Sequence, residues 1–296
     1  MNYAIGLDLG GSSVKAVAVT MDGRRLAGRN RDFDANIPMA WAKTVKTVAE
    51  ELQRECGHTA ESMGLSAPGL ASADGRSIAF MPGRLHGLEN FDWTEALGAS
   101  KPVPVLNDAH AALLGEVWVG AARGVHNVIM LTLGTGVGGA AMVDGHLLRG
   151  QIGRAGHLGH TSLNIDGVPD ICGAPGSLEW AIGNATIGER SGGRFATTHE
   201  LISAATAGDA GANEIWLRSV KHLAAGVCSF INILDPQVVL IGGGVARAGK
   251  FLFEPLRRFL DEMEWRPGGH QAELRPATLG EYAGAFGAAA NAVKAA

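Results

Sequence analysis

The feature that most constrains the fold is a pattern that occurs twice: an apolar strand, a glycine turn, a second apolar strand and an Asp-Gly pair. The first copy runs from YAIGLDL through GGSS and VKAVAV to the pair at 22–23. The second runs from VIMLTL through GTGVGG and AAMV to the pair at 144–145. Gly10 and Gly134 are equivalent positions in the two copies. We interpret the repeat as an internal duplication of a half-molecule that opens with a glycine-tipped β-hairpin.

The other apolar and alanine-rich segments predict an α/β protein of two lobes. Strands are predicted at 63–69, 103–107 and 237–241, and helices at 38–56, 108–120, 211–234 and 282–296. The last helix is expected to pack back on the N-terminal half. The predicted lobes are therefore a small N-terminal lobe of residues 1–110 plus 282–296 and a large C-terminal lobe of residues 111–281.

Composition narrows the possible partners and the compartment. The formal net charge is -4 and no long basic run is present, so we expect neither nucleic acid nor a membrane as partner. The 3 cysteines form no C-x-x-C pair, which favours a reducing compartment over a disulfide framework. The first residues lack the basic region of a signal peptide, and no apolar run approaches the roughly 20 residues of a membrane helix. We expect a cytoplasmic protein.

Three glycine clusters, at 10–11, 134–139 and 242–244, follow predicted buried strands. Glycine lets backbone N–H groups approach phosphate oxygens closely, although each cluster can also be a simple tight turn. No stretch supplies G-x-x-x-x-G-K-[ST], and GTGVGG is followed by a strand where a dinucleotide fingerprint needs a helix. The pattern predicts a nucleotide held between two β-hairpins, with the third glycine cluster serving the base or ribose.

Two acidic positions follow predicted strands and are candidates for chemistry. Asp8 lies two residues before Gly10, where a carboxylate would reach Mg²⁺, often through water, or would cap the turn. Asn107 and Asp108 lie where a strand passes into a helix, and helix capping alone would explain either residue. Next to a phosphate site, Asp108 is a candidate general base for phosphoryl transfer to a hydroxyl, with Asn107 holding the acceptor.

These residues resemble the successive motifs of the ROK family (repressors, open reading frames and sugar kinases). The motifs occur in family order over nearly the whole chain and read GLDLGGSSVKAV, SAPG, NDAHAALLGE, LTLGTGVGGA, RAGHLGH, PQVVLIGGGVA and AGAFGAAANA. The resemblance implies a two-lobe, actin-like (ribonuclease-H-like) ATPase fold with duplicated β-hairpin phosphate loops. It also implies that ATP and Mg²⁺ are used to phosphorylate a sugar, typically on the 6-hydroxyl of a hexose.

The resemblance assigns roles position by position. Asp108 matches the catalytic base and Asp8 the residue that reaches magnesium. The positions matching sugar-binding residues are Asn107, His157, His160 and Glu179. The positions matching ATP-binding loops are Gly10, Gly11, Ser12, Ser13, Gly134, Thr135, Gly136, Gly243 and Gly244.

The chain also departs from the family pattern. His157 stands where the family has a sugar-binding glutamate. The family zinc site would consist of His160 and cysteines at 170, 172 and 177, but here Asp170 and Ser177 replace two of them and only Cys172 remains. We therefore expect no zinc, since a serine hydroxyl is a poor ligand, and we interpret Ser177 as a helix N-cap.

The sequence thus predicts an ATP-dependent hexose kinase, with glucose as the default substrate. Alternatives are N-acetylmannosamine, N-acetylglucosamine, fructose or another hexose as substrate, polyphosphate as donor, or a sugar-binding regulator without catalysis. A family repressor is not expected, because its helix-turn-helix domain would precede a strand that here begins at Tyr3. A homodimer is implied by the resemblance alone.

Overall fold

The computed structural model describes residues 2–295 and contains two compact units. The first unit comprises Met1–Gly124, Leu147–Ala155 and Ala277–Ala296, and the second comprises Val125–His146 and Gly156–Pro276. Each unit is built on its own five-stranded sheet. No helix among the described residues is both long enough and apolar enough to cross a membrane.

The sheet of the first unit has the strand order β3-β2-β1-β4-β7. β1 pairs antiparallel with β2 and parallel with β4, and β4 pairs parallel with β7. The strands are β1 (Tyr3–Leu9), β2 (Ser13–Thr20), β3 (Arg25–Asp32), β4 (Ser62–Ala67) and β7 (Val105–Asn107), with a separate two-stranded sheet of β5 (Leu70–Ala71) and β6 (Ile78–Phe80). The helices are α1 (Ala40–Cys56), α2 (Trp93–Leu97), α3 (Asp108–Val119) and α9 (Ala283–Ala295).

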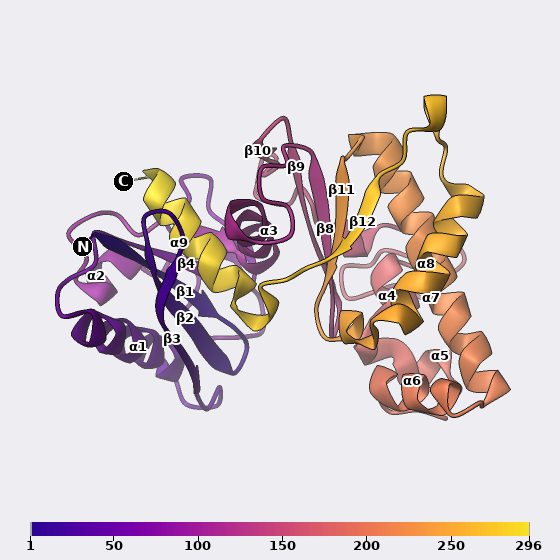
Figure 1. Cartoon of the computed structure of the whole chain (residues 1–296). Helices are drawn as coiled ribbons and strands as arrows, with labels where there is room; N and C mark the ends of the chain where they lie inside the picture. The colour runs from indigo at the N-terminus through magenta and orange to yellow at the C-terminus, as the bar shows by residue number, and fades with distance from the viewer. Residues whose placement is uncertain (1, 296) are drawn as a thin grey trace. The chain divides into compact units, whose positions relative to one another are not determined.

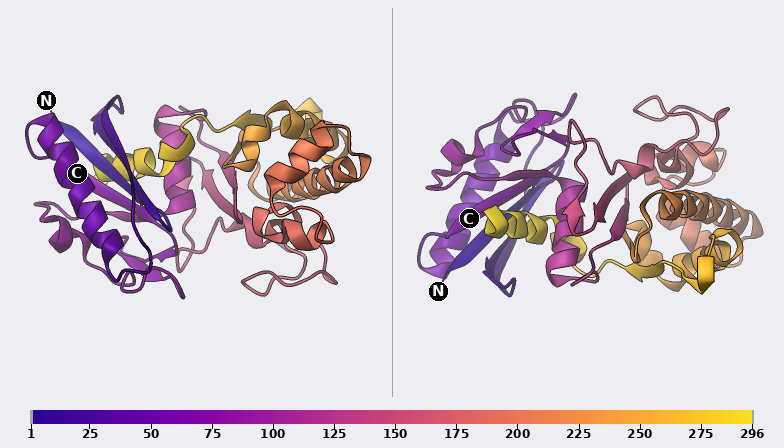
Figure 2. Two further views of the ribbon diagram at one scale, coloured as in Figure 1. Left: turned by 90° about the horizontal axis from the view of Figure 1, so that it is seen from below. Right: turned by 90° about the horizontal axis from the view of Figure 1, so that it is seen from above.

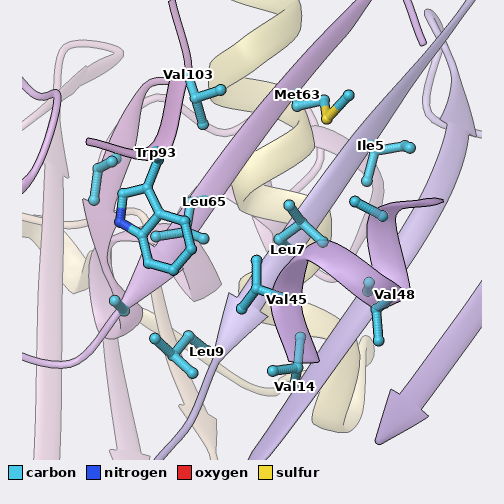
Figure 3. Close-up of a cluster of buried hydrophobic side chains, with 14 of the residues drawn as sticks. Ile5, Leu7, Leu9, Val14, Val45, Val48, Met63, Leu65, Trp93 and Val103 are labelled. Atoms are coloured by element: carbon cyan, nitrogen blue, oxygen red, sulfur yellow. The ribbon is translucent and has the colours of Figure 1, made fainter. Parts of the chain in front are cut away.

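Alternating side chains of β1 and β2 bury both faces of this sheet, as expected when successive residues of a strand point to opposite sides. One face packs against α1 in a cluster that includes Ile5, Leu7, Leu9, Val14, Val45, Val48 and Trp93 (Figure 3). The other face contributes Ala4, Val17 and Val19, which pack against α9. α1 and α9 accordingly lie on opposite faces of the sheet (Figures 1 and 2).

α9 lies unusually close to the backbone of the first sheet and of α3. A Cβ atom added at Gly6 of β1 would lie 1.8 Å from the carbonyl oxygen of Ala285, and one added at Gly287 would lie 1.7 Å from that of Ala111. Only glycine permits such an approach. The buried carboxylate of Glu116 on α3 also accepts hydrogen bonds from the backbone amides of Thr278 and Leu279, 2.8 and 2.7 Å away. The chain that enters α9 is therefore fixed to α3.

The sheet of the second unit repeats the topology of the first. Its order is β10-β9-β8-β11-β12, with β8 antiparallel to β9 and parallel to β11, and β11 parallel to β12. The strands are β8 (Val128–Leu133), β9 (Val137–Val143), β10 (His146–Leu147), β11 (Val238–Gly242) and β12 (Glu273–Pro276). The helices are α4 (Leu178–Ile182), α5 (Ile187–Arg190), α6 (Thr198–Thr206), α7 (Ala210–Leu234) and α8 (Lys250–Met263), with 3-10 turns η1 (Leu158–His160), η2 (Asn184–Thr186), η3 (Val245–Ala248) and η4 (Pro267–Gly269). The 3-10 turn η5 (Gly280–Tyr282) belongs to the first unit, where it precedes α9.

The two predicted glycine hairpins are confirmed, as β1–β2 and β8–β9. The second differs in detail from the prediction, because β9 begins at Val137 and only 134–136 form the turn. The glycines at 138 and 139 pair with β8 instead. A Cβ atom at Gly139 would lie 2.5 Å from the carbonyl oxygen of Gly156, so these glycines serve close packing as well as the turn.

Candidate active site

Asp8 is the acidic residue at the end of β1, and its carboxylate is closely surrounded in the first unit. It accepts a hydrogen bond from the hydroxyl of Ser66, its neighbour on the parallel strand β4. On the α9 side, a Cβ atom at Gly284 would lie 2.6 Å from the carboxyl carbon of Asp8. The first turn of α9 therefore contacts the carboxylate, and the N-terminal end of a helix favours negative charge nearby.

The surroundings of Asp8 change its acidity. Burial raises the pKa of Asp8 to about 6 from its usual 3.8. The hydrogen bond from Ser66 opposes this effect, and smaller contributions come from the charge of Asp108, which raises the pKa, and that of Lys15, which lowers it. A carboxylate in this state favours a cation beside it, because a cation removes the cost of its buried negative charge.

The first glycine turn, 10–13, follows Asp8 directly. The amide of Gly10 donates to the carbonyl of Ser13 at 2.8 Å, and a side chain at Gly11 would meet nothing within 4 Å. Lys15 is the residue of β2 that lies opposite Asp8 of β1 in the hairpin. Its ammonium donates a hydrogen bond to the Ser13 hydroxyl at 3.1 Å. Lys15 was not among the site residues proposed from the sequence. The sequence could have indicated Lys15, because it follows the Gly10-Gly11 turn closely and lies opposite Asp8 in the predicted hairpin.

Asn107 and Asp108 lie at the junction of β7 and α3. The Asn107 side-chain oxygen caps the helix by accepting from the amides of Ala109 and His110, and its Nδ2 donates to the carbonyl of Gly69 at 2.9 Å. One Nδ2 hydrogen therefore remains for another acceptor. Asp108 is exposed, accepts from the Ala109 amide at 2.8 Å, and lies close enough to Asp8 to raise its pKa.

The second glycine turn, 134–136, lies beside the glycines that follow β11. Gly243 has φ 86° and fits against the end of β8, where a Cβ atom would lie 2.3 Å from the carbonyl oxygen of Leu133. A side chain at Gly134 or Gly244 would meet nothing within 4 Å. Parallel strands end at the same edge of their sheet, so the second and third predicted ATP-binding loops are adjacent in the second unit.

Glu179, on α4, contacts the second glycine turn. Its Oε2 accepts a hydrogen bond from the backbone amide of Val137 at 2.9 Å. The segment after α4 supports the same turn, because the amide of Asn184 donates to the carbonyl of Gly134 and that of Ala185 to the carbonyl of Thr135, both at 2.9 Å. The sequence predicted a sugar contact for Glu179 and gave no sign of this loop contact.

In the second unit, His157 directly precedes η1 and His160 is its last residue. The Nδ1 of His160 donates to Oδ2 of Asp170 at 2.8 Å, and its Nε2 lies 3.5 Å from the sulfur of Cys172. The other oxygen of Asp170 accepts from the amides of Cys172 and Ala174. Although burial favours the neutral acid, these hydrogen bonds and one from the Ser177 hydroxyl lower the pKa of Asp170. His160 is therefore held in one orientation by an ionised carboxylate.

The family resemblance implies zinc at this position, and the residues present do not fit it. The donor atoms of His160, Asp170 and Cys172 lie within 4.8 Å of one another. However, both oxygens of Asp170 already accept hydrogen bonds, and the Ser177 oxygen accepts from the amide of Trp180 as the N-cap of α4. A closed zinc site needs four strong N, S or O ligands. In this chain Asp170 instead closes the 160–177 segment through hydrogen bonds.

The predicted site residues thus form two groups. The first unit brings together Asp8, Asn107, Asp108 and the turn at 10–13. The second unit brings together the turns at 134–136 and 243–244 with Glu179. In chemical terms, the first group offers a cation-favouring carboxylate beside an exposed carboxylate that can accept a proton. The second offers glycine turns with room beside Gly134 and Gly244.

Comparison with known proteins identifies the family and the fold of the chain. The model of the ROK family matches residues 4–295. The chain is 33% identical to the glucokinase of Thermotoga maritima over 306 residues, which cover 96% of this chain and 95% of the relative. It is 30% identical to the N-acetylmannosamine kinase of Yersinia pseudotuberculosis over 296 residues, covering 98% of both.

One solved structure is informative about the fold. The ROK family glucokinase from Streptomyces griseus, in complex with glucose and AMPPNP, superposes with a TM-score of 0.80 at 27% identity, covering 99% of this chain and 100% of that one. The predicted actin-like ATPase fold is therefore confirmed, and an ATP analogue binds to a protein that shares it.

Proposed function

Because the chain belongs to the ROK family, we propose that it transfers the γ-phosphoryl group of ATP to a hydroxyl of a hexose. The protein is a carbohydrate kinase, as are its relatives named glucokinase and N-acetylmannosamine kinase. The observation that carries the mechanism is the pair of carboxylates in the first unit. Asp8 lies beside the first glycine turn, and Asp108 is exposed and close enough to raise the pKa of Asp8.

We assign Asp108 as the general base. Its carboxylate accepts the proton of the attacking sugar hydroxyl as the new O–P bond forms, and the bond between the γ-phosphorus and the bridging oxygen breaks to release ADP. The hydrogen bond from the Ala109 amide keeps the Asp108 carboxylate at the start of α3. The glycine-turn amides at 10–13 and 134–136 are assigned to the phosphates, where N–H groups stabilise the transferred charge.

Asp8 is the residue assigned to Mg²⁺. Its raised pKa and its place beside the first turn fit a carboxylate that holds a hydrated cation. When bound, magnesium neutralises charge on the phosphate oxygens. Ser66 and Gly284 orient the carboxylate, because the hydroxyl bonds to it and the absent side chain leaves room for it.

The sugar is assigned to Asn107, His157, His160 and Glu179. Glucose is the first candidate for substrate and the 6-hydroxyl the first candidate for acceptor, on the example of the glucokinase relatives. N-acetylmannosamine is the second candidate, since a kinase for that sugar is nearly as similar. His157, in place of a carboxylate, offers the sugar a different set of hydrogen bonds, and such polar contacts strongly control selectivity.

The remaining assignments follow from the same proposal. We assign ATP as the donor. We propose the cytoplasm as the compartment, because ATP is available there and its reducing conditions suit the thiols of Cys56, Cys172 and Cys228, none of which forms a disulfide. A homodimer is proposed from the family resemblance.

One experiment tests the proposal directly. ADP release is measured with MgATP across a panel of glucose, N-acetylmannosamine, N-acetylglucosamine, mannose and fructose, with a reaction without sugar as the baseline. The proposal predicts sugar-dependent ADP release and a sugar 6-phosphate as product. ADP release that no sugar stimulates would contradict it, and formation of a sugar phosphate from polyphosphate in the absence of ATP would reassign the donor.

A further inference from the structure

The short helix α4 lies between two parts of the proposed site in the second unit. At its N-terminal end, the amide of Leu178 donates to the carbonyl of Thr161, which follows η1 directly, at 2.9 Å. Ser177, which caps the helix, is fully buried and bonds to Asp170, the partner of His160. The helix therefore begins on the segment that carries the proposed sugar-binding histidines.

The other end of α4 is fixed to the second glycine turn. The amides of Asn184 and Ala185, just beyond the helix, donate to the carbonyls of Gly134 and Thr135 at 2.9 Å. Between these two anchors, Glu179 reaches the same turn and accepts from the amide of Val137. Three hydrogen bonds thus join one side of α4 and η2 to a single turn of three residues, 134–136, and to the first residue of β9.

The contact between Glu179 and this turn is tight. A Cβ atom at Gly136 would lie 2.2 Å from Oε2 of Glu179 and 3.5 Å from its Oε1. The carboxylate therefore occupies the space that a side chain at position 136 would need. Oε1 makes no hydrogen bond to the part of the chain that the structure describes, so it can accept from a ligand hydroxyl while Oε2 stays bonded to the Val137 amide.

We propose that Glu179 is a positioning residue for the second phosphate loop as well as a sugar ligand. One oxygen holds the loop through the Val137 amide, and the other accepts a sugar hydroxyl. The inference rests on the proposed function, since it needs the turn at 134–136 to bind nucleotide. Its consequence is that the sugar site and the phosphate loop share one side chain, so a change at Glu179 alters nucleotide binding even when no sugar is present.

A role in sugar binding alone predicts a different outcome. Such a ligand would alter sugar affinity and leave nucleotide affinity in sugar-free buffer unchanged. The charged acceptor makes the bond to Val137 stronger than a neutral one would be. Removing the Glu179 carboxylate leaves the Val137 amide without its acceptor. Because nucleotide binding needs the loop in place, we expect the affinity for AMPPNP to fall about tenfold.

The test uses the full chain and three variants, Glu179→Ala, Glu179→Gln and Glu189→Ala. Glu179→Ala removes both proposed contacts, whereas Glu179→Gln keeps a side-chain oxygen for the Val137 amide. Glu189 is the matched control, because its carboxylate lies in the same region and accepts from the indole of Trp180 at 3.3 Å without touching the turn. AMPPNP with Mg²⁺ is titrated in the absence of sugar, and hydrogen exchange is followed at the Val137 amide.

We expect Glu179→Ala to weaken AMPPNP binding about tenfold and to speed exchange at Val137, while Glu189→Ala changes neither. Glu179→Gln should restore most of the AMPPNP affinity and still weaken sugar binding. If Glu179→Ala binds AMPPNP as the wild type does and is impaired only toward sugar, the inference is wrong. The nucleotide titration stands apart from catalysis, so a wild-type protein that binds AMPPNP without phosphorylating any sugar would refute the proposed function and not this inference.

Discussion

The two glycine hairpins share a backbone plan, but each has a carboxylate from a different source. In the first, Asp8 stands two residues before Gly10 in the strand itself. The equivalent position before Gly134 is Thr132, and there the carboxylate is that of Glu179, which reaches the turn from α4. The duplicated topology was thus kept while the chemistry diverged. The first hairpin holds an acid suited to a cation, and the second is held in place by an acid on another element.

The largest effect is expected at Asp108, which belongs only to the first half. Asp108→Asn removes the proposed base and should lower kcat by about 10²–10⁴-fold. Sugar affinity should change little, because the amide keeps the size and the backbone hydrogen bond of the acid. Steady-state kinetics and sugar titration measure the two quantities separately. A variant that keeps more than about a tenth of the wild-type kcat would remove Asp108 from the role of base.

The next largest effect is expected at Asp8, which is compared with Thr132, the equivalent strand position of the second hairpin. Asp8→Asn should lower kcat by about 100-fold and shift activity to higher Mg²⁺ concentrations, since charge stabilisation by a metal is worth several kcal/mol. Thr132→Val, at the matching position of the second hairpin, should leave both quantities near their wild-type values. Magnesium titrations at saturating ATP and sugar provide the measurement. If Thr132→Val lowered kcat and altered the magnesium dependence as much as Asp8→Asn, the two strand positions would not differ in function.

The raised pKa of Asp8 predicts a pH dependence of stability. Between about pH 4 and pH 6 the folded protein keeps a proton on Asp8 that the unfolded chain has released, so the free energy of unfolding falls as pH rises through this window. Asp8→Asn removes this pH-dependent fall in the free energy of unfolding, because asparagine does not titrate. In magnesium-free buffer the variant should become more stable than the wild type by up to about 2–3 kcal/mol above pH 7, and the difference should vanish below about pH 4.

Urea unfolding at several pH values measures this difference. Thr132→Val is again the control, because Thr132 carries no titratable group and its effect on stability should not vary with pH. A stability difference for Asp8→Asn that stays constant from pH 4 to pH 8 would mean that the carboxylate is not buried as the structure describes.

The smallest effect distinguishes the two glycines of the second turn. Gly136→Ala places a methyl group against Glu179 and should cost about 1–2 kcal/mol of stability through the hydrogen bond to Val137. Gly134→Ala meets nothing within 4 Å and should change stability by less than about 0.5 kcal/mol. Thermal unfolding without ligands makes the comparison. In the Glu179→Ala background the two alanine variants should become alike, and a persisting difference would exclude Glu179 as its cause.

Local patterns predicted much of the fold because they report local preferences. Apolar runs ending in glycine predicted β1, β2, β8 and β11, and a glycine-free, alanine-rich segment predicted α1. Ser177 was predicted as an N-cap from its place before an apolar run, and it caps α4. Such features depend on residues within a few positions of one another, so a single sequence contains them.

The site was predicted less completely, because several of its contacts join residues distant in the chain. The contact of Gly284 with Asp8 depends on how closely α9 packs against the first sheet. The segment Leu147–Ala155 belongs to the first unit although it follows the second hairpin. The roles assigned to Asp8, Asp108 and the sugar-binding residues stay predictions that the experiments above address.

The sequence by itself determined the duplicated hairpins, the family and the acids available for chemistry, because strand patterns, glycine turns and motif order are local properties. Only the tertiary structure showed that Glu179 contacts the second glycine turn and that Asp8 is buried. Burial raises the pKa of Asp8 against the opposing hydrogen bond from Ser66, and Glu179 on α4 reaches the Val137 amide. Electrostatic environment and hydrogen-bond geometry depend on neighbours in space, and spacing along the chain does not specify them.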